Sequence, residues 1–308
     1  MKIFHFTFKI IFLLFLLFLT KVSVNALEVQ KKSRLEGDIK MSVSKLLFNV
    51  SNEDSQTYLN CSQMEDWDIV VDSDAIASEK YAAEEFQKWF EKATENHLPV
   101  RDNTEEASHH VYIGQSKELG KIGIDISTEK LGQEGFDVIV QEDFVAIVGG
   151  KPRGTLYGTY QFLEDGLGIR FLTCDHTHIP EAKDTKIPCG KYSYSPPFSF
   201  RWSYYRENSE EPEFAAKLRI NTVTPDEKLG GNTPQNLINH SFSWLVPFDK
   251  YGEEHPEYYA LVDGKRDTNK AGGGPQLCVT NPEVIEIAAE SAIHYINPQP
   301  KKKNVSVS

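Results

Sequence analysis

The sequence predicts an α/β protein: a small α/β sandwich, followed by a segment that begins as strand, helix and strand. Between residues 66 and 190, short apolar stretches typical of strands alternate with amphipathic stretches typical of helices. The proline-rich boundary Ser195-Pro196-Pro197 then precedes another strand-like stretch. Because helices that alternate with strands cover the faces of a sheet, we expect residues 66–190 to form a sheet with helices packed on it.

The first domain opens with a strand at residues 66–72, which read Asp-Trp-Asp-Ile-Val-Val-Asp. Ser78 is the expected cap of a helix that runs to about Asn96, before Pro99, and whose apolar residues recur every three or four positions. The remaining expected elements are, in order, a strand at 110–114, a short helix at 116–119, a hairpin of strands 135–141 and 144–149, a helix at 153–165 and a strand at 169–172.

The second segment begins with the alternating stretch Phe198–Tyr204, which predicts a strand. A helix at about Pro212–Leu218 and a second strand at Ile220–Thr224 follow. A long irregular region then leads to Pro282, which opens a helix through Ile293.

Composition limits the partners of the chain. Its 308 residues carry a formal net charge of -12, which argues against a nucleic-acid or anionic-membrane partner because both require a basic surface. No cofactor and no metal are expected. His176 and His178 would lie on one side of an extended segment as two zinc ligands do, but no third ligand is evident nearby. Residues 149–154 (Gly-Gly-Lys-Pro-Arg-Gly) lack the Gly-Lys-Ser/Thr ending of a phosphate loop and predict a structural turn.

The N-terminus predicts export. Lys2 and Lys9 precede the apolar run Ile10–Leu19, so residues 1–26 are expected to be a signal peptide. The alternative is a signal anchor, and a membrane partner is expected only in that case. The rest of the chain would then face the secretory lumen or the outside. Residues 27–65 are polar and predict a poorly ordered lead-in.

Cysteines and sequons fit that compartment. Among Cys61, Cys174, Cys189 and Cys278, the pair Cys174–Cys189 flanks a single loop and is the favoured disulfide; four thiols are the alternative. The expected glycosylation sites are Asn49, Asn60, Asn239 and Asn304.

The most distinctive stretch is residues 149–165, continued by Leu167–Leu172. It resembles the small α/β domain that precedes the catalytic barrel in α-glucuronidases and in family 20 β-hexosaminidases (hexosaminidase domain 2-like), and the resemblance covers residues 66–190. It implies a non-catalytic companion domain. Gly154 and Gly158 share a helix face where a bulky residue would hold the helix off the sheet, and Gly168 permits a turn with positive φ.

The resemblance further implies that residues 198–308 form the first part of a (β/α)8-type barrel. Residues 276–284, together with His255–Tyr258, resemble a subgroup of secreted proteins that join this companion domain to a barrel-like domain of unknown function.

The expected partner is a carbohydrate. Ligands of such barrels bind at the loops after the strands, and residues 252–266 (GEEHPEYYALVDGKR), with an Asp263-Gly264 turn, are expected to form such a loop. Aromatic rings suit the apolar face of a sugar, and polar groups suit its hydroxyls. The candidate stacking residues are Trp244, Tyr258 and Tyr259, and the candidate hydroxyl partners are His240 and Glu257. The alternative is that these aromatics pack the loop onto the barrel. A glycan on Asn239 would lie beside His240 and conflict with this site.

Arg201 is a further candidate substrate-binding residue. It lies on the first expected barrel strand, where family 20 enzymes are known for a substrate-binding arginine, and its guanidinium suits sugar hydroxyls or a uronate carboxylate. A structural salt bridge inside the barrel is the equal alternative. A uronic acid suits this arginine and a hexosamine suits the family 20 likeness.

We assign no catalytic residue. Glycoside hydrolysis normally needs two facing carboxylates, and the segment from Phe198 is much shorter than the roughly 250 residues of a complete barrel. Three functions remain: a glycoside hydrolase-like protein whose barrel is cut short, a short protein that binds glycans without cleaving them, and a secreted interaction protein that retains only the fold.

Overall fold

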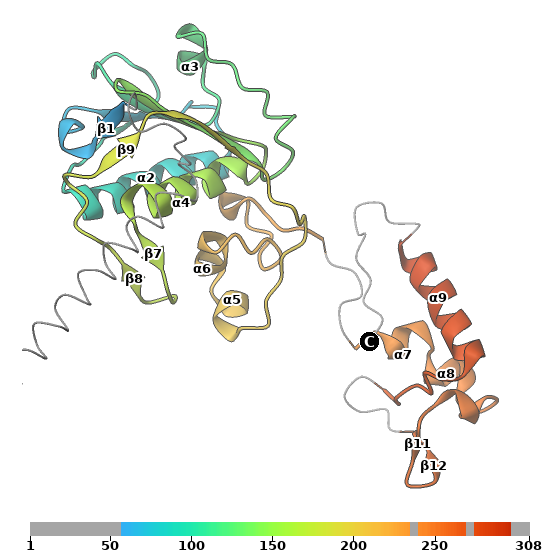
Figure 1. Cartoon of the computed structure of the whole chain (residues 1–308). Helices are drawn as coiled ribbons and strands as arrows, with labels where there is room; N and C mark the ends of the chain where they lie inside the picture. The colour runs from blue at the N-terminus through green and yellow to red at the C-terminus, as the bar shows by residue number, and fades with distance from the viewer. Residues whose placement is uncertain (1–56, 235–239, 269–273, 297–308) are drawn as a thin grey trace, which may run out of the picture. The chain divides into compact units, whose positions relative to one another are not determined.

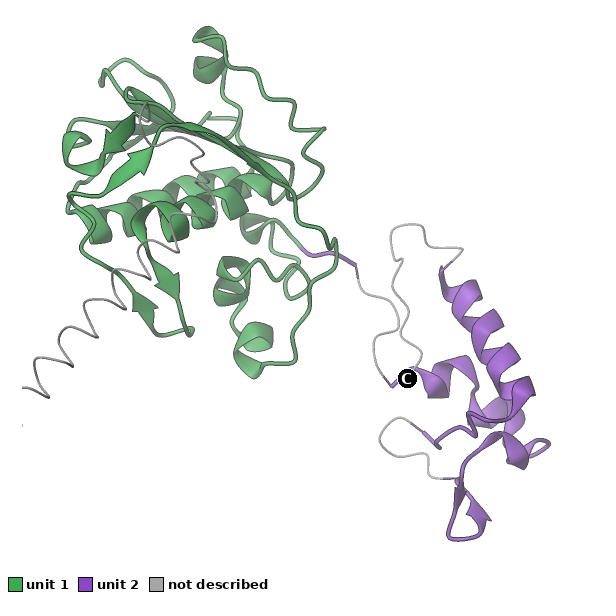
Figure 2. Cartoon of the chain, in the orientation of Figure 1, with its two compact units in different colours: residues 1–231 green, residues 232–308 purple. Residues whose placement is uncertain are grey.

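The computed structural model describes residues 57–234, 240–268 and 274–296. The chain divides into two compact units, residues 1–231 and 232–308 (Figure 2). Each unit has its own buried apolar cluster. The predicted α/β class is confirmed, and the boundary between the units lies after Gly231 instead of near Ser195.

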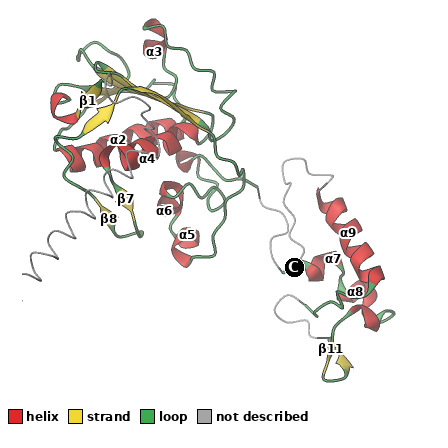
Figure 3. Ribbon diagram, viewed as in Figure 1, coloured by secondary structure: helices red, strands yellow, loops and turns green. Residues whose placement is uncertain are grey.

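A mixed six-stranded sheet organises the first unit (Figures 1 and 3). Its strands, in spatial order, are β10 (Gly190–Tyr194), β5 (Phe136–Val140), β6 (Phe144–Gly149), β4 (His110–Ile113), β2 (Asp68–Val70) and β3 (Val100–Arg101). The last four run parallel to one another, whereas β5 and β10 are antiparallel to their neighbours. The predicted hairpin is therefore the β5–β6 pair.

Two long helices cover one face of this sheet. In Figure 1, α2 (Ala77–Thr94) and α4 (Gly154–Leu167) lie side by side beneath the strands. The apolar face predicted for α2 is buried, with Phe86 and Phe90 fully enclosed. The opposite face carries a smaller cluster around Val70 and Leu119, the latter from α3 (Lys117–Lys121). Both faces are covered, as expected for a sandwich of helices on a sheet.

The N-terminal cap of α2 differs from the prediction. Ser78 does not cap the helix, because its hydroxyl donates to the carbonyl of Pro152 (2.6 Å). The N–H of Ile76 instead donates to the carboxylate of Glu79 (3.2 Å). The helix ends at Thr94, close to the predicted end near Asn96, and its C-cap Glu95 has a left-handed φ of 66°.

The glycines of α4 have the predicted roles. A Cβ on Gly154 would lie 2.3 Å from the carbonyl oxygen of Gly135, and one on Gly158 would lie 3.0 Å from side-chain carbons of Ile147 and Phe136. The helix therefore approaches the sheet as closely as it does only because these side chains are absent. Gly168 ends the helix with a φ of 77°.

The first unit is larger than predicted at both ends. Tyr58–Asn60 form β1, which pairs with β9 (Lys186–Pro188), and Leu59 is buried in the main core. The helical turn η2 (Cys61–Gln63) follows. The prediction of a poorly ordered lead-in was therefore wrong for residues 57–65, and residues 27–56 lie outside the described part of the chain, as does the predicted signal peptide. At the other end, β10 extends the sheet to Tyr194.

Residues 198–231 belong to the first unit and contain no strand. The elements there are α5 (Arg206–Glu210), α6 (Pro212–Lys217) and η3 (Glu227–Leu229). The helix expected near Pro212 is confirmed, but both predicted strands are wrong. One backbone hydrogen bond joins their segments, from the N–H of Asn221 to the carbonyl of Arg201 (3.4 Å). The other hydrogen bonds between them use side chains: the N–H of Arg201 donates to Oδ1 of Asn221 (2.9 Å), Thr222 Oγ1 donates to the carbonyl of Arg201 (3.1 Å), and Asn221 Nδ2 donates to the carbonyl of Ser199 (2.9 Å). One backbone hydrogen bond does not make a ladder, so no sheet forms there, and the described residues contain no closed barrel.

The predicted Cys174–Cys189 disulfide is not formed in this structure and stays a prediction. Cys174 lies in the exposed turn between β7 (Arg170–Phe171) and β8 (Thr177–His178). Cys189 instead joins β9 to β10, where its N–H donates to the carbonyl of Thr57 (2.9 Å).

The second unit is small and mostly helical. Its elements are α7 (Phe242–Leu245), α8 (Phe248–Tyr251), η4 (Pro256–Tyr258), β11 (Leu261–Val262), β12 (Lys265–Arg266) and α9 (Pro282–Ile296). The helix predicted from Pro282 is confirmed. Asp263 and Gly264, with φ of 49° and 74°, form the predicted turn between β11 and β12.

Candidate functional site

The predicted substrate-binding residues fall into two groups. Arg201 belongs to the first unit, and His240, Trp244, Glu257 and Tyr258 belong to the second. Asn239, with its predicted glycan, lies outside the described residues.

Tyr258 and Tyr259 are core residues of the second unit. Tyr258 is 5% exposed, its ring stacks on that of His255 (4.6 Å between centroids), and its hydroxyl donates to Oε2 of Glu283 (2.6 Å). That bond to a carboxylate raises the pKa of Tyr258 to about 12. Tyr259 is 1% exposed and packs edge-on against Phe248. The prediction that these rings stack on a sugar was wrong, and the alternative that they hold the loop in place is the one observed.

The other three residues of the second unit are accessible. Trp244, on α7, is 61% exposed, and His240 is exposed with a left-handed φ of 47°. Glu257 lies 3.0 Å from Nδ1 of His255. A backbone hydrogen bond and, after it, His255 lower the pKa of Glu257, so this side chain is a carboxylate at neutral pH. Their roles in binding stay predictions.

The first unit contains a pocket of about 330 Å³ beside Arg201, here called the Arg201 pocket. Its apolar wall consists of Phe136, Tyr157, Tyr194, Pro196, Pro197, Phe198 and Leu218. Its polar groups are Glu134, Gln161, Arg201 and Arg219. The small α/β domain and the segment after Pro197 therefore build this pocket together.

Arg201 forms a salt bridge, as its alternative structural role predicted, but the partner is not a residue of a barrel. Its Nη1 lies 2.7 Å from Oε2 of Glu134, which belongs to the α/β domain and not to a barrel. Its Nε donates to the carbonyl of Arg219 (2.7 Å). Its Nη2 is buried and has no hydrogen-bond acceptor among the described residues.

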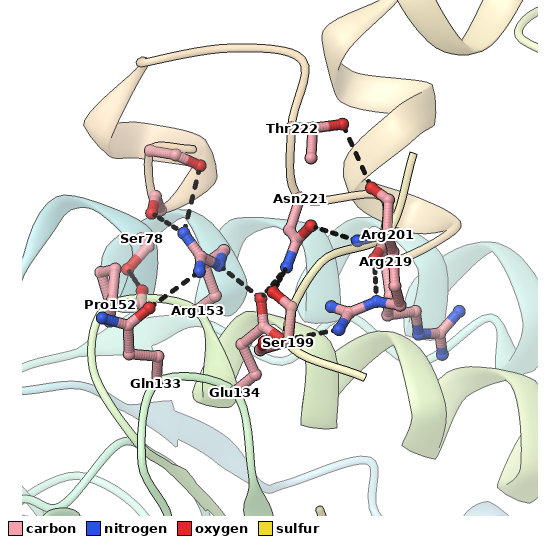
Figure 4. A network of polar contacts seen from close by, with 12 residues as sticks. Ser78, Gln133, Glu134, Pro152, Arg153, Ser199, Arg201, Arg219, Asn221 and Thr222 are labelled. Atoms are coloured by element: carbon pink, nitrogen blue, oxygen red, sulfur yellow. Dashed lines mark hydrogen bonds and ion pairs between the residues drawn. The ribbon is translucent and has the colours of Figure 1, made fainter. Parts of the chain in front are cut away.

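Glu134 is the centre of this polar network (Figure 4). Besides Arg201, its carboxylate accepts hydrogen bonds from Arg153 Nε (2.8 Å) and Asn221 Nδ2 (2.6 Å). Arg153 is 2% exposed and also donates to the carbonyl of Gly230 (3.2 Å). The network thus ties the turn before α4 to the last residues of the first unit.

The sequence reasoning missed Glu134, Arg153 and Asn221. Arg153 lies in the glycine-rich stretch 149–154, at the start of a predicted helix, and this position was the one signal in the sequence that could have indicated a structural role for it. Glu134 and Asn221 are separated by 87 positions, and no spacing in the sequence relates them.

The described residues contain neither a candidate metal site nor a candidate membrane span. No group of three or more His, Cys, Asp or Glu side chains within the described ranges could hold a metal ion. None of the helices in those ranges combines the length and the apolar content that crossing a bilayer requires.

Two families match parts of the sequence. Residues 53–162 match the glycosyl hydrolase family 67 N-terminus, and residues 171–308 match a domain of unknown function, DUF4838. No curated protein matches the sequence. The first unit therefore carries a glycoside-hydrolase-like N-terminal domain, and the region of unknown function follows it.

Several solved structures are similar at low identity. They include a GH20 exo-β-N-acetylglucosaminidase from Vibrio harveyi (14% identity, 58% of this chain and 25% of that one, TM-score 0.36). A chitobiase from Flavobacterium johnsoniae matches with 14% identity over 82% of this chain and 42% of that one (TM-score 0.37). A family GH115 4-O-methyl-α-glucuronidase matches with 13% identity over 77% and 40% (TM-score 0.44). The chain spans less than half the length of each.

Proposed function

We propose that this chain is a secreted, glycoside hydrolase-like protein that acts on or binds glycans containing a uronic acid or a hexosamine. The match of residues 53–162 to the N-terminal domain of glycosyl hydrolase family 67 carries this proposal. The acidic net charge of -12 is compatible with a neutral glycan, because such a glycan, unlike a nucleic acid, does not require a basic surface.

The second unit offers the accessible groups that sugar binding needs. The indole of Trp244 is 61% exposed, so one ring face is available for the apolar face of a pyranose. His240 is exposed two residues before the start of α7 and can exchange hydrogen bonds with hydroxyls. Glu257 adds an exposed carboxylate that accepts hydrogen bonds. We assign these residues to binding and none to catalysis.

Export is supported by the charged and apolar pattern of residues 1–26. Expression of the whole chain in a eukaryotic secretory host tests it. The medium should contain protein whose N-terminus begins after Ala26, and retention in the membrane fraction with residues 1–26 attached would favour the signal anchor.

A second function, that of a secreted interaction protein, is favoured by the surface of α9. Ile285 and Ile293 are each 56% exposed on this helix, and Leu261 of β11 is 63% exposed. Exposed apolar side chains gathered on one small unit are typical of surfaces that contact another protein.

A glycan array separates the two functions. The full chain should bind uronic-acid or hexosamine glycans, and Trp244→Ala should weaken that binding roughly tenfold, because an aromatic stacking contact contributes about 0.5–1.5 kcal/mol beyond its buried area. Val262→Ala is the matched control, since it removes another exposed apolar side chain of the same unit. Equal glycan binding by wild type and Trp244→Ala, or no glycan binding at all, would contradict the proposal at this site.

A further inference from the structure

We propose that the Arg201 pocket of the first unit is itself a ligand site, and that it takes a sugar acid through its carboxylate. The choice of a sugar rests on the proposed function, whereas the choice of an anion rests on the pocket alone. The site would give the small α/β domain a binding role of its own, separate from the Trp244 surface.

The charges around the pocket favour an anion. Three guanidinium groups, those of Arg153, Arg201 and Arg219, face two carboxylates. Glu134 is shared by Arg153 and Arg201, and Glu164 pairs with Arg219 at 2.7 Å. This leaves one excess positive charge, in a chain whose overall charge is -12. Because all five groups are largely shielded from water, the excess is weakly screened.

The next carboxyl group along α4 does not cancel this excess. Asp165 accepts a hydrogen bond from Nε2 of Gln161 (2.6 Å). It is also absent from the pocket lining, where Glu134 is the one acidic side chain.

The hydrogen-bond inventory points to an acceptor on the ligand. Nη1 and Nε of Arg201 are occupied by Glu134, by the carbonyl of Phe198 and by the carbonyl of Arg219. Nη2 is the remaining donor group, buried and with no acceptor among the described residues. Leaving such a group unsatisfied is costly, and a carboxylate oxygen is the acceptor that satisfies it best.

The walls indicate what accompanies the carboxylate. Phe136, Tyr157, Tyr194 and Phe198 supply rings to the pocket, and Leu218 supplies an aliphatic surface. Such walls suit the apolar face of one pyranose ring. The volume of about 330 Å³ is at the lower end of the range for small-molecule sites and therefore suits a single residue of a glycan.

Titration calorimetry of the full chain tests the site with four probes: glucuronate, glucose, N-acetylglucosamine and benzoate. Glucuronate should bind the wild type, more weakly as salt is added, while the two uncharged sugars bind at least tenfold more weakly. Arg201→Lys should lose about ten- to a hundredfold in glucuronate affinity, because a lysine that keeps the ion pair with Glu134 offers no second nitrogen. Arg206→Lys is the control, since Arg206 is exposed and pairs with Glu210 on the surface.

A second variant keeps the test valid if Arg201→Lys does not fold. Phe198→Ala removes an exposed ring from the pocket wall and leaves the arginine network intact, and it should weaken glucuronate binding severalfold. Unchanged glucuronate affinity in Arg201→Lys and Phe198→Ala, or equal affinity for glucose, would overturn the site. Binding of benzoate without glucuronate would overturn the sugar assignment. If calorimetry shows no glucuronate binding at the Arg201 pocket but the glycan array shows binding that depends on Trp244, the proposed function stands without this site. If calorimetry shows the expected glucuronate binding but glycan binding does not depend on Trp244, only the Trp244 site is removed.

Discussion

Replacing Glu134 by glutamine should destabilise the first unit more than any single surface change. The carboxylate of Glu134 receives hydrogen bonds from Arg153 Nε (2.8 Å) and Asn221 Nδ2 (2.6 Å) and an ion pair from Arg201 Nη1 (2.7 Å). Glutamine keeps the size of the side chain but removes the charge and turns an NH2 group toward donors. Arg153, at 2% exposure, would then be a buried cation without a counter-ion.

The expected loss is about 3–5 kcal/mol in the free energy of unfolding, the usual cost of removing one partner of a buried ion pair. For a unit of this size each kcal/mol corresponds to roughly 2–4 °C in the melting temperature, so a decrease of about 6–20 °C should follow. Circular dichroism of the full chain, with urea and thermal unfolding, measures both quantities. Glu142→Gln is the control, because Glu142 is exposed in the β5–β6 turn.

A loss below about 1 kcal/mol for Glu134→Gln would refute the reasoning, since it would mean that the arginines are solvated or find other acceptors. A loss of 3 kcal/mol or more in the Glu142→Gln control would do the same, because the effect would then not depend on burial.

Two further predictions concern titration and thiol chemistry. Burial raises the pKa of Tyr157 to about 12, whereas the phenol of the unfolded chain has a pKa of about 10 and ionises first. The contribution of Tyr157 to the free energy of unfolding is therefore complete below pH 10 and is lost between pH 10 and pH 12. In Tyr157→Phe, the free energy of unfolding should decrease less steeply with pH, by up to about 1.4 kcal/mol per pH unit. Urea unfolding at pH 8 and pH 11 measures this, and an equal decrease in stability between the two pH values in both proteins would contradict the prediction. Iodoacetamide at pH 8 should label exposed Cys174 in the native chain but not Cys61, whose burial raises its pKa to about 12. Mass spectrometry of unreduced peptides reads the outcome, and a linked Cys174–Cys189 peptide would contradict the expected labelling and support the disulfide.

The sequence predicted the parts of the fold whose signals are local. The three- and four-residue spacing of Phe86, Trp89 and Ala93 was enough to place α2, since one face of a helix must be apolar to pack on a sheet. Gly154 and Gly158 were predicted correctly for a similar reason: close packing of a helix on a strand leaves no room for Cβ atoms.

The wrong predictions all depended on a partner distant in sequence. Phe198, Phe200, Trp202 and Tyr204 alternate as in a strand, but a strand exists only where a neighbour supplies a ladder. Here the neighbouring segment supplies one backbone hydrogen bond, from Asn221 to Arg201, and otherwise side-chain hydrogen bonds from Asn221 and Thr222. The sequence around Tyr258 is typical of a loop with an exposed aromatic residue, yet Tyr258 is buried, and its hydroxyl donates to Glu283 of α9, 25 positions away. A residue's type indicated its chemistry, but its burial could not be read from neighbours in the sequence.

The same network explains why the compact units and the matched families have different boundaries. The family matches meet between residues 162 and 171, whereas the first unit extends to Gly231. The intervening segment brings Arg201, Asn221 and the Gly230 carbonyl to Glu134 and Arg153, so its polar groups are satisfied by the α/β domain. Buried charges of this kind are tolerated only when their partners are present. The opening residues of the region of unknown function therefore fold as part of the α/β domain, and a chain cut at residue 195 would expose Glu134 and Arg153 together with the walls of the Arg201 pocket.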